Sequence, residues 1–132
     1  MKITKELECV IATLTALGRN KGKYLSLNDI VEITNFSKPF TRKIVAKILK
    51  LGYIKSEMGP QGGYALNDGS TKISLKKLVE DIENRKRFVE CYNSKSCISK
   101  KKCIISNSMK DLNRQLDRVL ESFTIENFIK GE

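Results

Sequence analysis

Three cysteines lie at equal spacing in one polar, basic segment of the chain. Cys91, Cys97 and Cys103 are each separated by five residues, and the intervening residues include lysines but no carboxylate. Neighbouring ammonium groups favour the thiolate form and offset the negative charge of a thiolate-bound cluster. Zinc sites usually contain C-x2-C pairs, which this segment lacks. The pattern favours an iron–sulfur site, and three incidental loop cysteines are the alternative.

The remaining chemistry of the chain excludes most catalytic sites. The sequence contains no histidine, which rules out histidine-based catalytic triads and the common catalytic zinc sites. Neither a nucleophile–base pair nor a phosphate-binding loop is discernible. We therefore expect that the protein is not an enzyme.

The charge of the chain points to a polyanionic partner. Twenty-five basic and 15 acidic side chains give a formal net charge of +10. Residues 38–55 contain six basic side chains and no acidic one. Such clustering is typical of nucleic-acid binding, and a merely basic surface is the alternative. No apolar run is long enough to cross a bilayer and no secretion signal is present, so we expect a cytoplasmic protein without membrane contact.

The elements before the cysteine segment follow the order of a DNA-binding motif. Apolar spacing predicts a helix over residues 3–18. A second helix begins after Ser26, with Asp29 in the capping-box position, and ends near Asn35. A third is capped by Ser37 and ends at Gly52. The predicted buried positions of the second and third helices are Leu27, Ile30, Val31 and Ile33, and Ile44, Val45, Ile48, Leu49 and Leu51.

Two short strands then flank a glycine- and proline-rich turn at residues 59–63, which predicts a β-hairpin. Two helices, a tight turn, a basic helix and a hairpin make a winged helix-turn-helix, whose second helix enters the major groove. Arg42 is the best candidate for a base contact, because a guanidinium can bond guanine with two hydrogen bonds. The predicted DNA-binding residues are Lys38, Thr41, Arg42, Lys43, Lys47, Lys50, Lys55 and Gln61.

The chain after the cysteines has the pattern of a coiled coil. Apolar residues recur at alternating spacings of four and three from Ile105 to Phe123, which predicts a long helix with one apolar seam. Internal packing of that seam is the alternative to a dimer. We favour a homodimer interface, made by Ile105, Met109, Leu112, Leu116 and Val119.

The expected fold is thus mainly α: a winged helix-turn-helix with a β-hairpin wing over residues 1–83, a cysteine-bearing cluster loop over 84–103, and a dimerisation helix and C-terminal tail over 104–132. A fourth helix is expected after Ser74, and Thr124 is the expected cap of a short last helix holding Ile125, Phe128 and Ile129.

The chain resembles the IscR/NsrR (Rrf) family of bacterial winged-helix regulators over nearly its whole length. The resemblance rests on Met1-Lys2-Ile3-Thr4, the segment Leu51 to Ser56, the glycine-rich stretch Gly59 to Leu66, Ile73-Ser74-Leu75 and the triple-cysteine spacing. It implies a homodimer with crossed long helices that binds a palindromic DNA operator and senses iron–sulfur status, oxygen or nitric oxide.

The resemblance also bears on the fourth cluster ligand. The IscR-like branch is expected to use a histidine, which this chain lacks, and the NsrR-like branch uses a carboxylate on the N-terminal helix of the partner subunit. Glu8 matches that position, although as glutamate in place of aspartate, and Cys9 beside it is a rival donor. A solvated Glu8 and a buried Cys9 are the alternatives. We favour a 4Fe-4S cluster on Cys91, Cys97, Cys103 and Glu8 or an open position; a 2Fe-2S cluster is the second possibility.

We expect a transcriptional regulator, such as a repressor, whose operator binding is controlled by a redox-sensing cluster. The alternatives are a repressor controlled by a bound metabolic enzyme and a switch based on thiol oxidation, both without a cluster.

Overall fold

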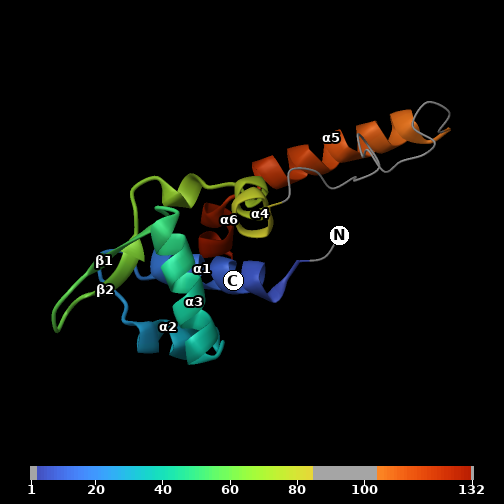
Figure 1. Cartoon of the computed structure of the whole chain (residues 1–132). Coiled ribbons are helices and arrows are strands. Elements are labelled where there is room, and N and C mark those ends of the chain that lie inside the picture. Colours follow the sequence, from blue (N-terminus) through green and yellow to red (C-terminus); the bar gives the residue numbers. More distant parts are fainter. Residues whose placement is uncertain (1–2, 85–103, 132) are drawn as a thin grey trace. The chain divides into compact units, whose positions relative to one another are not determined.

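The computed structural model of the chain describes residues 3–84 and 104–131 (Figure 1). It comprises two compact units, described separately below. Among the described residues, the core unit consists of residues 3–73 and 124–131, and the helical unit consists of residues 74–84 and 104–123. The secondary structure is mainly helical with an antiparallel hairpin, which confirms the predicted fold class.

The core unit opens with three helices whose starts are fixed by side-chain caps. These helices are α1 (Lys5–Arg19), α2 (Leu27–Thr34) and α3 (Lys38–Lys50). The Ser26 hydroxyl accepts a hydrogen bond from the Asp29 backbone amide at 3.1 Å, and the Asp29 carboxylate accepts one from the Ser26 amide at 3.0 Å. This is the predicted capping box. The buried apolar side chains of the three helices are Leu7, Cys9, Val10, Leu14, Ala16, Leu17, Ile30, Ile44, Val45 and Ile48.

The buried stripes of α2 and α3 are narrower than predicted. Ile33, Leu49 and Leu51 are exposed, and Leu27 and Val31 are only half-buried. The physical reason on α3 is geometric: successive residues point 100° apart, so the side that packs against α1 takes Ile44, Val45 and Ile48 and leaves Leu49 outside.

The hairpin consists of β1 (Ile54–Glu57) and β2 (Gly63–Leu66), with Ile54 opposite Leu66 and Glu57 opposite Gly63. Leu25 extends the pairing, because its amide donates to the Tyr64 carbonyl at 2.9 Å and its carbonyl accepts from the Tyr64 amide at 2.8 Å. Gly63 has a φ of +143°, and a Cβ there would lie 2.4 Å from the Leu25 carbonyl oxygen. Glycine is therefore required where the hairpin meets this segment. A short helical turn, η1 (Ser70–Lys72), follows.

The core unit is completed by the C-terminal helix α6 (Ile125–Lys130), which packs against α1. A Cβ on Gly18 would lie 2.2 Å from Cδ1 of Ile129. The lack of a side chain at Gly18 therefore lets α6 pack closely on α1. The Arg19 guanidinium donates to the carbonyl oxygens of Phe128 (3.1 Å), Ile129 (3.2 Å) and Gly131. A cation thus satisfies the free carbonyls at the end of α6.

The helical unit contains α4 (Leu75–Glu83) and α5 (Ser106–Ser122), which confirms the predicted long helix after the cysteine segment. The Leu75 amide donates to the Phe123 carbonyl at 2.7 Å, and Lys76 pairs with Glu121 at 2.9 Å and Asp117 at 3.7 Å. The hydrogen bond to Glu121 raises the pKa of Lys76. Among the described helices, none has the length and apolar character needed to span a membrane.

Candidate nucleic-acid interface

The turn between α2 and α3 sets the direction of the basic helix. Asn35 adopts the left-handed conformation (φ 62°), and its amide donates to the Val31 carbonyl at 2.9 Å, which ends α2. The Ser37 hydroxyl caps α3 by accepting from the Phe40 amide at 3.4 Å. The rings of Phe36 and Phe40 lie 6.0 Å apart across the turn. The predicted helix-turn-helix is therefore present, and with the hairpin it forms a winged helix-turn-helix.

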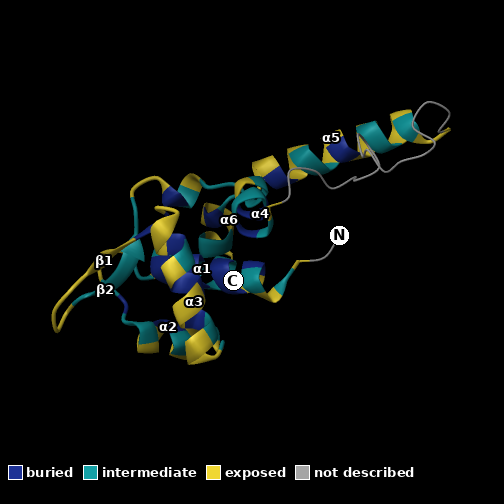
Figure 2. Ribbon diagram, viewed as in Figure 1, coloured by how far each residue is buried: buried dark blue, intermediate teal, exposed yellow. Residues whose placement is uncertain are grey.

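One side of α3 is cationic and open to solvent (Figure 2). Its exposed basic residues are Lys38, Arg42, Lys43 and Lys50. The helix carries no acidic residue. A helix of this kind offers donors to DNA phosphates and base edges without an internal carboxylate to compete.

Thr41 is not part of that exposed face, which corrects the sequence prediction. Its side chain is fully buried, and its hydroxyl donates to the Ser37 carbonyl at 2.8 Å. The reason is helical spacing: Thr41 precedes Ile44 by three residues and Val45 by four, so it shares their buried side. Its donor is used inside the helix and does not face a ligand.

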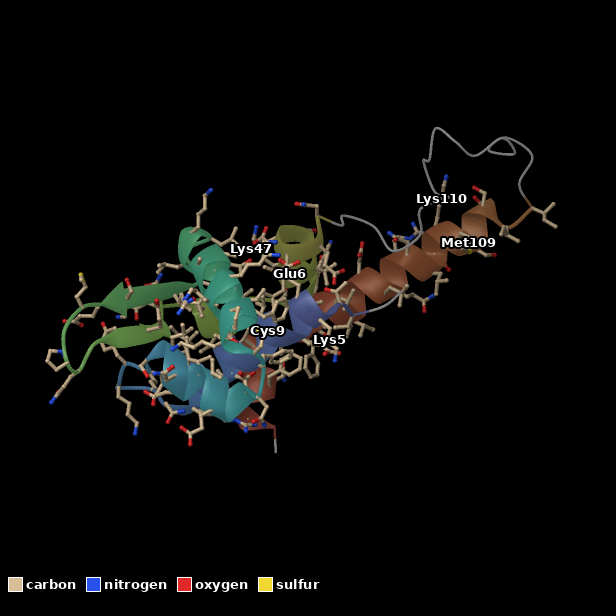
Figure 3. The ribbon with its side chains drawn as sticks, turned by 60° about the horizontal axis from the view of Figure 1, so that its bottom comes forward. Lys5, Glu6, Cys9, Lys47, Met109 and Lys110 are labelled. Carbon is tan, nitrogen blue, oxygen red and sulfur yellow. The ribbon has the colours of Figure 1, made fainter. Side chains whose placement is uncertain are left out.

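Lys47 differs from the other predicted phosphate contacts on α3. Its Nζ lies 2.7 Å from the Glu6 Oε1 on the first turn of α1. The two side chains are 36% and 31% exposed, so the pair lies at the edge of the core unit. Figure 3 shows both residues, with Cys9 nearby on α1.

Three exposed apolar positions were missed by sequence reasoning. Ala46 and Leu49 lie on the same side of α3 as Arg42 and Lys50, and Leu49 is 37% exposed. Ala46 follows Arg42 by four residues, and this spacing is the signal that would have placed it there. Met58, after β1, is 96% exposed.

The wing carries the other predicted contacts. Lys55 on β1 and Gln61 in the hairpin turn are both exposed. The turn is closed by a hydrogen bond from the Gly62 amide to the Gly59 carbonyl at 3.0 Å. Both side chains are thus available on a hydrogen-bonded hairpin.

The candidate metal ligands fall in different parts of the chain. Glu8 is exposed on α1, where its Oε2 pairs with Lys5 at 3.2 Å. Cys9 is fully buried, and burial raises the pKa of its thiol. A small core residue is thus the better description of Cys9, because a buried neutral thiol is a poor metal ligand. Cys91, Cys97 and Cys103 lie outside the described residues, and within the described ranges no group of metal-binding side chains is found.

The predicted dimer seam follows one side of α5. Leu112 is 47% exposed and Val119 is 63% exposed, and Ile105 is exposed at the start of the helix. Met109 and Leu116 are half-buried. Within the part of the chain that the structure describes, the helix therefore leaves an apolar side exposed.

A model of the Rrf2 family, described as iron-dependent transcriptional regulator, matches residues 3–131 of the chain. The chain is also similar to the HTH-type transcriptional regulator NsrR of Bacillus licheniformis. The two are 26% identical over 136 residues, which cover 100% of this chain and 94% of that protein.

Two solved structures share the fold. The oxidized form of CymR from Staphylococcus aureus superposes with a TM-score of 0.76 at 20% identity, covering 100% of this chain and 98% of that one. IscR of T. potens superposes with a TM-score of 0.74 at 20% identity, covering 98% and 87% respectively.

Proposed function

Because the chain belongs to the Rrf2 family of transcriptional regulators, we propose that it is a homodimeric cytoplasmic regulator that reads a palindromic operator with α3 and the wing. The observation that carries this proposal is the exposed side of α3, with Lys38, Arg42, Lys43 and Lys50 and no carboxylate. Two such helices in a dimer would read two half-sites of one operator.

The exposed residues divide into two kinds of contact. Arg42 reads a base edge, since its guanidinium matches the two acceptors of guanine. Lys38, Lys43, Lys50 and Lys55 neutralise phosphates, and Gln61 contacts DNA from the wing. Ala46 and Leu49 add apolar surface beside Arg42 that suits thymine methyl groups.

The test begins with selection of bound duplexes from a randomised library, followed by fluorescence anisotropy with the selected and a scrambled duplex. Arg42→Ala should reduce the preference for the selected duplex by about 1–3 kcal/mol. Lys50→Ala should weaken both duplexes alike and lower the salt slope by up to ~1. An unchanged preference in Arg42→Ala would show that this residue does not read bases. No change in either variant would refute the interface.

The proposed dimer is formed through α5. The exposed side chains of Ile105, Leu112 and Val119 lie on one side of the helix at a spacing of seven residues, with Met109 and Leu116 between them. Pairing with the same side of a second copy would remove this apolar surface from water.

We further propose that Cys91, Cys97 and Cys103 bind an iron–sulfur cluster, 4Fe-4S in preference to 2Fe-2S, with Glu8 of the partner subunit as fourth ligand. The equal cysteine spacing supports this, and so does the family description as iron-dependent. The exposure of Glu8 fits the role, because its carboxylate projects from α1 with only Lys5 paired to it among the interactions described. When bound, a cluster would supply reaction with oxygen or nitric oxide; the chain supplies thiolates and neighbouring lysines that offset its charge.

Protein purified without oxygen should then be brown and contain iron and acid-labile sulfide. Replacing any one of Cys91, Cys97 and Cys103 by Ser should bleach it. Glu8→Ala should change the absorption spectrum or speed cluster loss, and Cys9→Ala should have much less effect on either. Stoichiometric zinc without sulfide would refute the cluster.

A second candidate function is control by thiol oxidation, favoured by the likeness to a protein crystallised as oxidized CymR. Colourless anaerobic protein whose DNA affinity changes with a peroxide, and recovers with a thiol reductant, would support it. Colourless protein insensitive to oxidants would favour control by a bound enzyme.

A further inference from the structure

The pair between Lys47 and Glu6 has a direct bearing on how α3 meets DNA. Lys47 is half-buried on α3, and its ammonium lies 2.7 Å from the Glu6 carboxylate (Figure 3). By contrast, Lys43 and Lys50 on the same helix have exposed side chains. The lysines of α3 therefore do not all present the same charge to a ligand.

A carboxylate beside an ammonium changes what that lysine contributes to DNA binding. A free lysine that meets a phosphate releases a counterion, which strengthens binding and steepens its salt dependence. A lysine already paired has little net charge to offer, and the carboxylate repels the phosphate that approaches. Glu6 belongs to α1, so its position is set by the packing of α1 against α3 and not by the interface itself.

We propose that Glu6 is an intramolecular competitor of DNA phosphates for Lys47. It offsets the charge of Lys47 and lowers the affinity for operator and unrelated DNA by the same factor. On a chain with a net charge of +10 this limits sequence-independent binding. The operator preference is left to other contacts, chiefly Arg42. This inference rests on the proposed DNA-binding function and adds a residue outside the interface that sets its strength.

The test is a double-mutant cycle of Glu6→Gln and Lys47→Gln, measured by anisotropy on a selected and a scrambled duplex over a salt series. Glu6→Gln should tighten both duplexes about two- to fivefold, the range expected for an exposed pair, and steepen the salt slope by up to ~1. Lys47→Gln leaves the carboxylate unpaired and should weaken both. The double variant should bind within about twofold of the wild type, because it lacks both charges.

Matched controls separate this role from a general effect of charge. Glu32→Gln removes an exposed carboxylate from α2 and should change affinity less than Glu6→Gln. Glu6→Asp keeps the charge and should bind like the wild type. Circular dichroism confirms that each variant is folded.

If Glu6→Gln weakened binding or left it unchanged, Glu6 would not compete with phosphate and the inference would be overturned. A Glu32→Gln effect as large as that of Glu6→Gln would overturn it too. The proposed function fails separately, when Arg42→Ala and Lys50→Ala both leave DNA binding intact.

Discussion

Two helices of this chain, α3 and α5, each leave one side uncovered, and the chemistry of the two uncovered sides is opposite. On α3 the exposed side holds three lysines and one arginine, with the smaller apolar surface of Ala46 and Leu49 beside them. On α5 the uncovered side holds leucine, isoleucine and valine at coiled-coil spacing. A cationic surface gains most from a polyanion, whereas an apolar surface gains most from another apolar surface.

Under the proposed function, α3 contacts DNA and α5 contacts a second copy of the chain. The two helices are therefore expected to tolerate different substitutions. A charge placed on the open side of α5 would oppose its pairing, and a charge removed from the open side of α3 would weaken its contact with phosphates.

The largest effect is expected on α5. Leu112→Lys with Val119→Lys should convert the dimer into monomers, because four ammonium groups would face each other across the seam of the pair. Loss of the second half-site should weaken operator binding by about 100-fold or more. Multi-angle light scattering and anisotropy measure both. Asn107→Lys with Gln115→Lys adds the same charge at exposed polar positions of α5 and should remain dimeric. A wild-type monomer at micromolar concentration would contradict the assignment of α5.

A smaller effect is expected from two adjacent residues of α3. Ile48 is fully buried and Leu49 is 37% exposed. Ile48→Ala should lower the free energy of unfolding by about 2–5 kcal/mol, because it leaves a cavity in the core. Leu49→Ala should cost under about 1 kcal/mol and act mainly on DNA affinity. Urea denaturation measures the first and anisotropy the second. Equal losses of stability in the two variants would show that Leu49 belongs to the buried stripe of α3 after all.

The smallest effect concerns the thiol on the inner side of α1. Burial raises the pKa of Cys9 above that of an unfolded thiol, so the folded chain holds this proton more tightly. Its contribution to stability is present below the unfolded pKa and falls as the pH rises above it. The wild type should therefore lose stability relative to Cys9→Ala as the pH rises through and above 9.0, the ordinary pKa of a cysteine thiol. Parallel urea titrations measure this difference. If the difference in free energy of unfolding stayed constant with pH, burial would not disfavour the thiolate form of Cys9.

Local signals were sufficient to predict most of the secondary structure. Each of these signals depends on residues only a few positions apart, so a short stretch of sequence is enough to predict it. They are the Ser26–Asp29 capping box, the Ser37 cap and the glycine-rich hairpin turn. The prediction for Thr41 follows its polar side chain, whereas its spacing of three residues from Ile44 and four from Val45 places it on the buried side of α3.

Other features depend on partners far along the chain. The Glu6–Lys47 pair joins residues 41 positions apart, and no local pattern indicates that the two side chains meet. The packing of α6 on α1 could not be predicted either. The apolar residues of α6 indicate that this helix packs against another element, but not which one. The cysteine pattern, in contrast, is purely a matter of sequence, and its residues lie outside the described ranges.

The docking of α6 on α1 has a consequence for how the chain is made. Arg19 bonds carbonyls 109 to 112 residues further along, so the core unit is closed by some of the most distant contacts in the sequence. Distant contacts form slowly, because a long loop must be ordered first. During synthesis, residues 3–73 can reach their final packing only after residues 124–131 have left the ribosome. By then α5 has already emerged from the ribosome. Its apolar side is therefore available to a neighbouring chain before the core unit has finished folding.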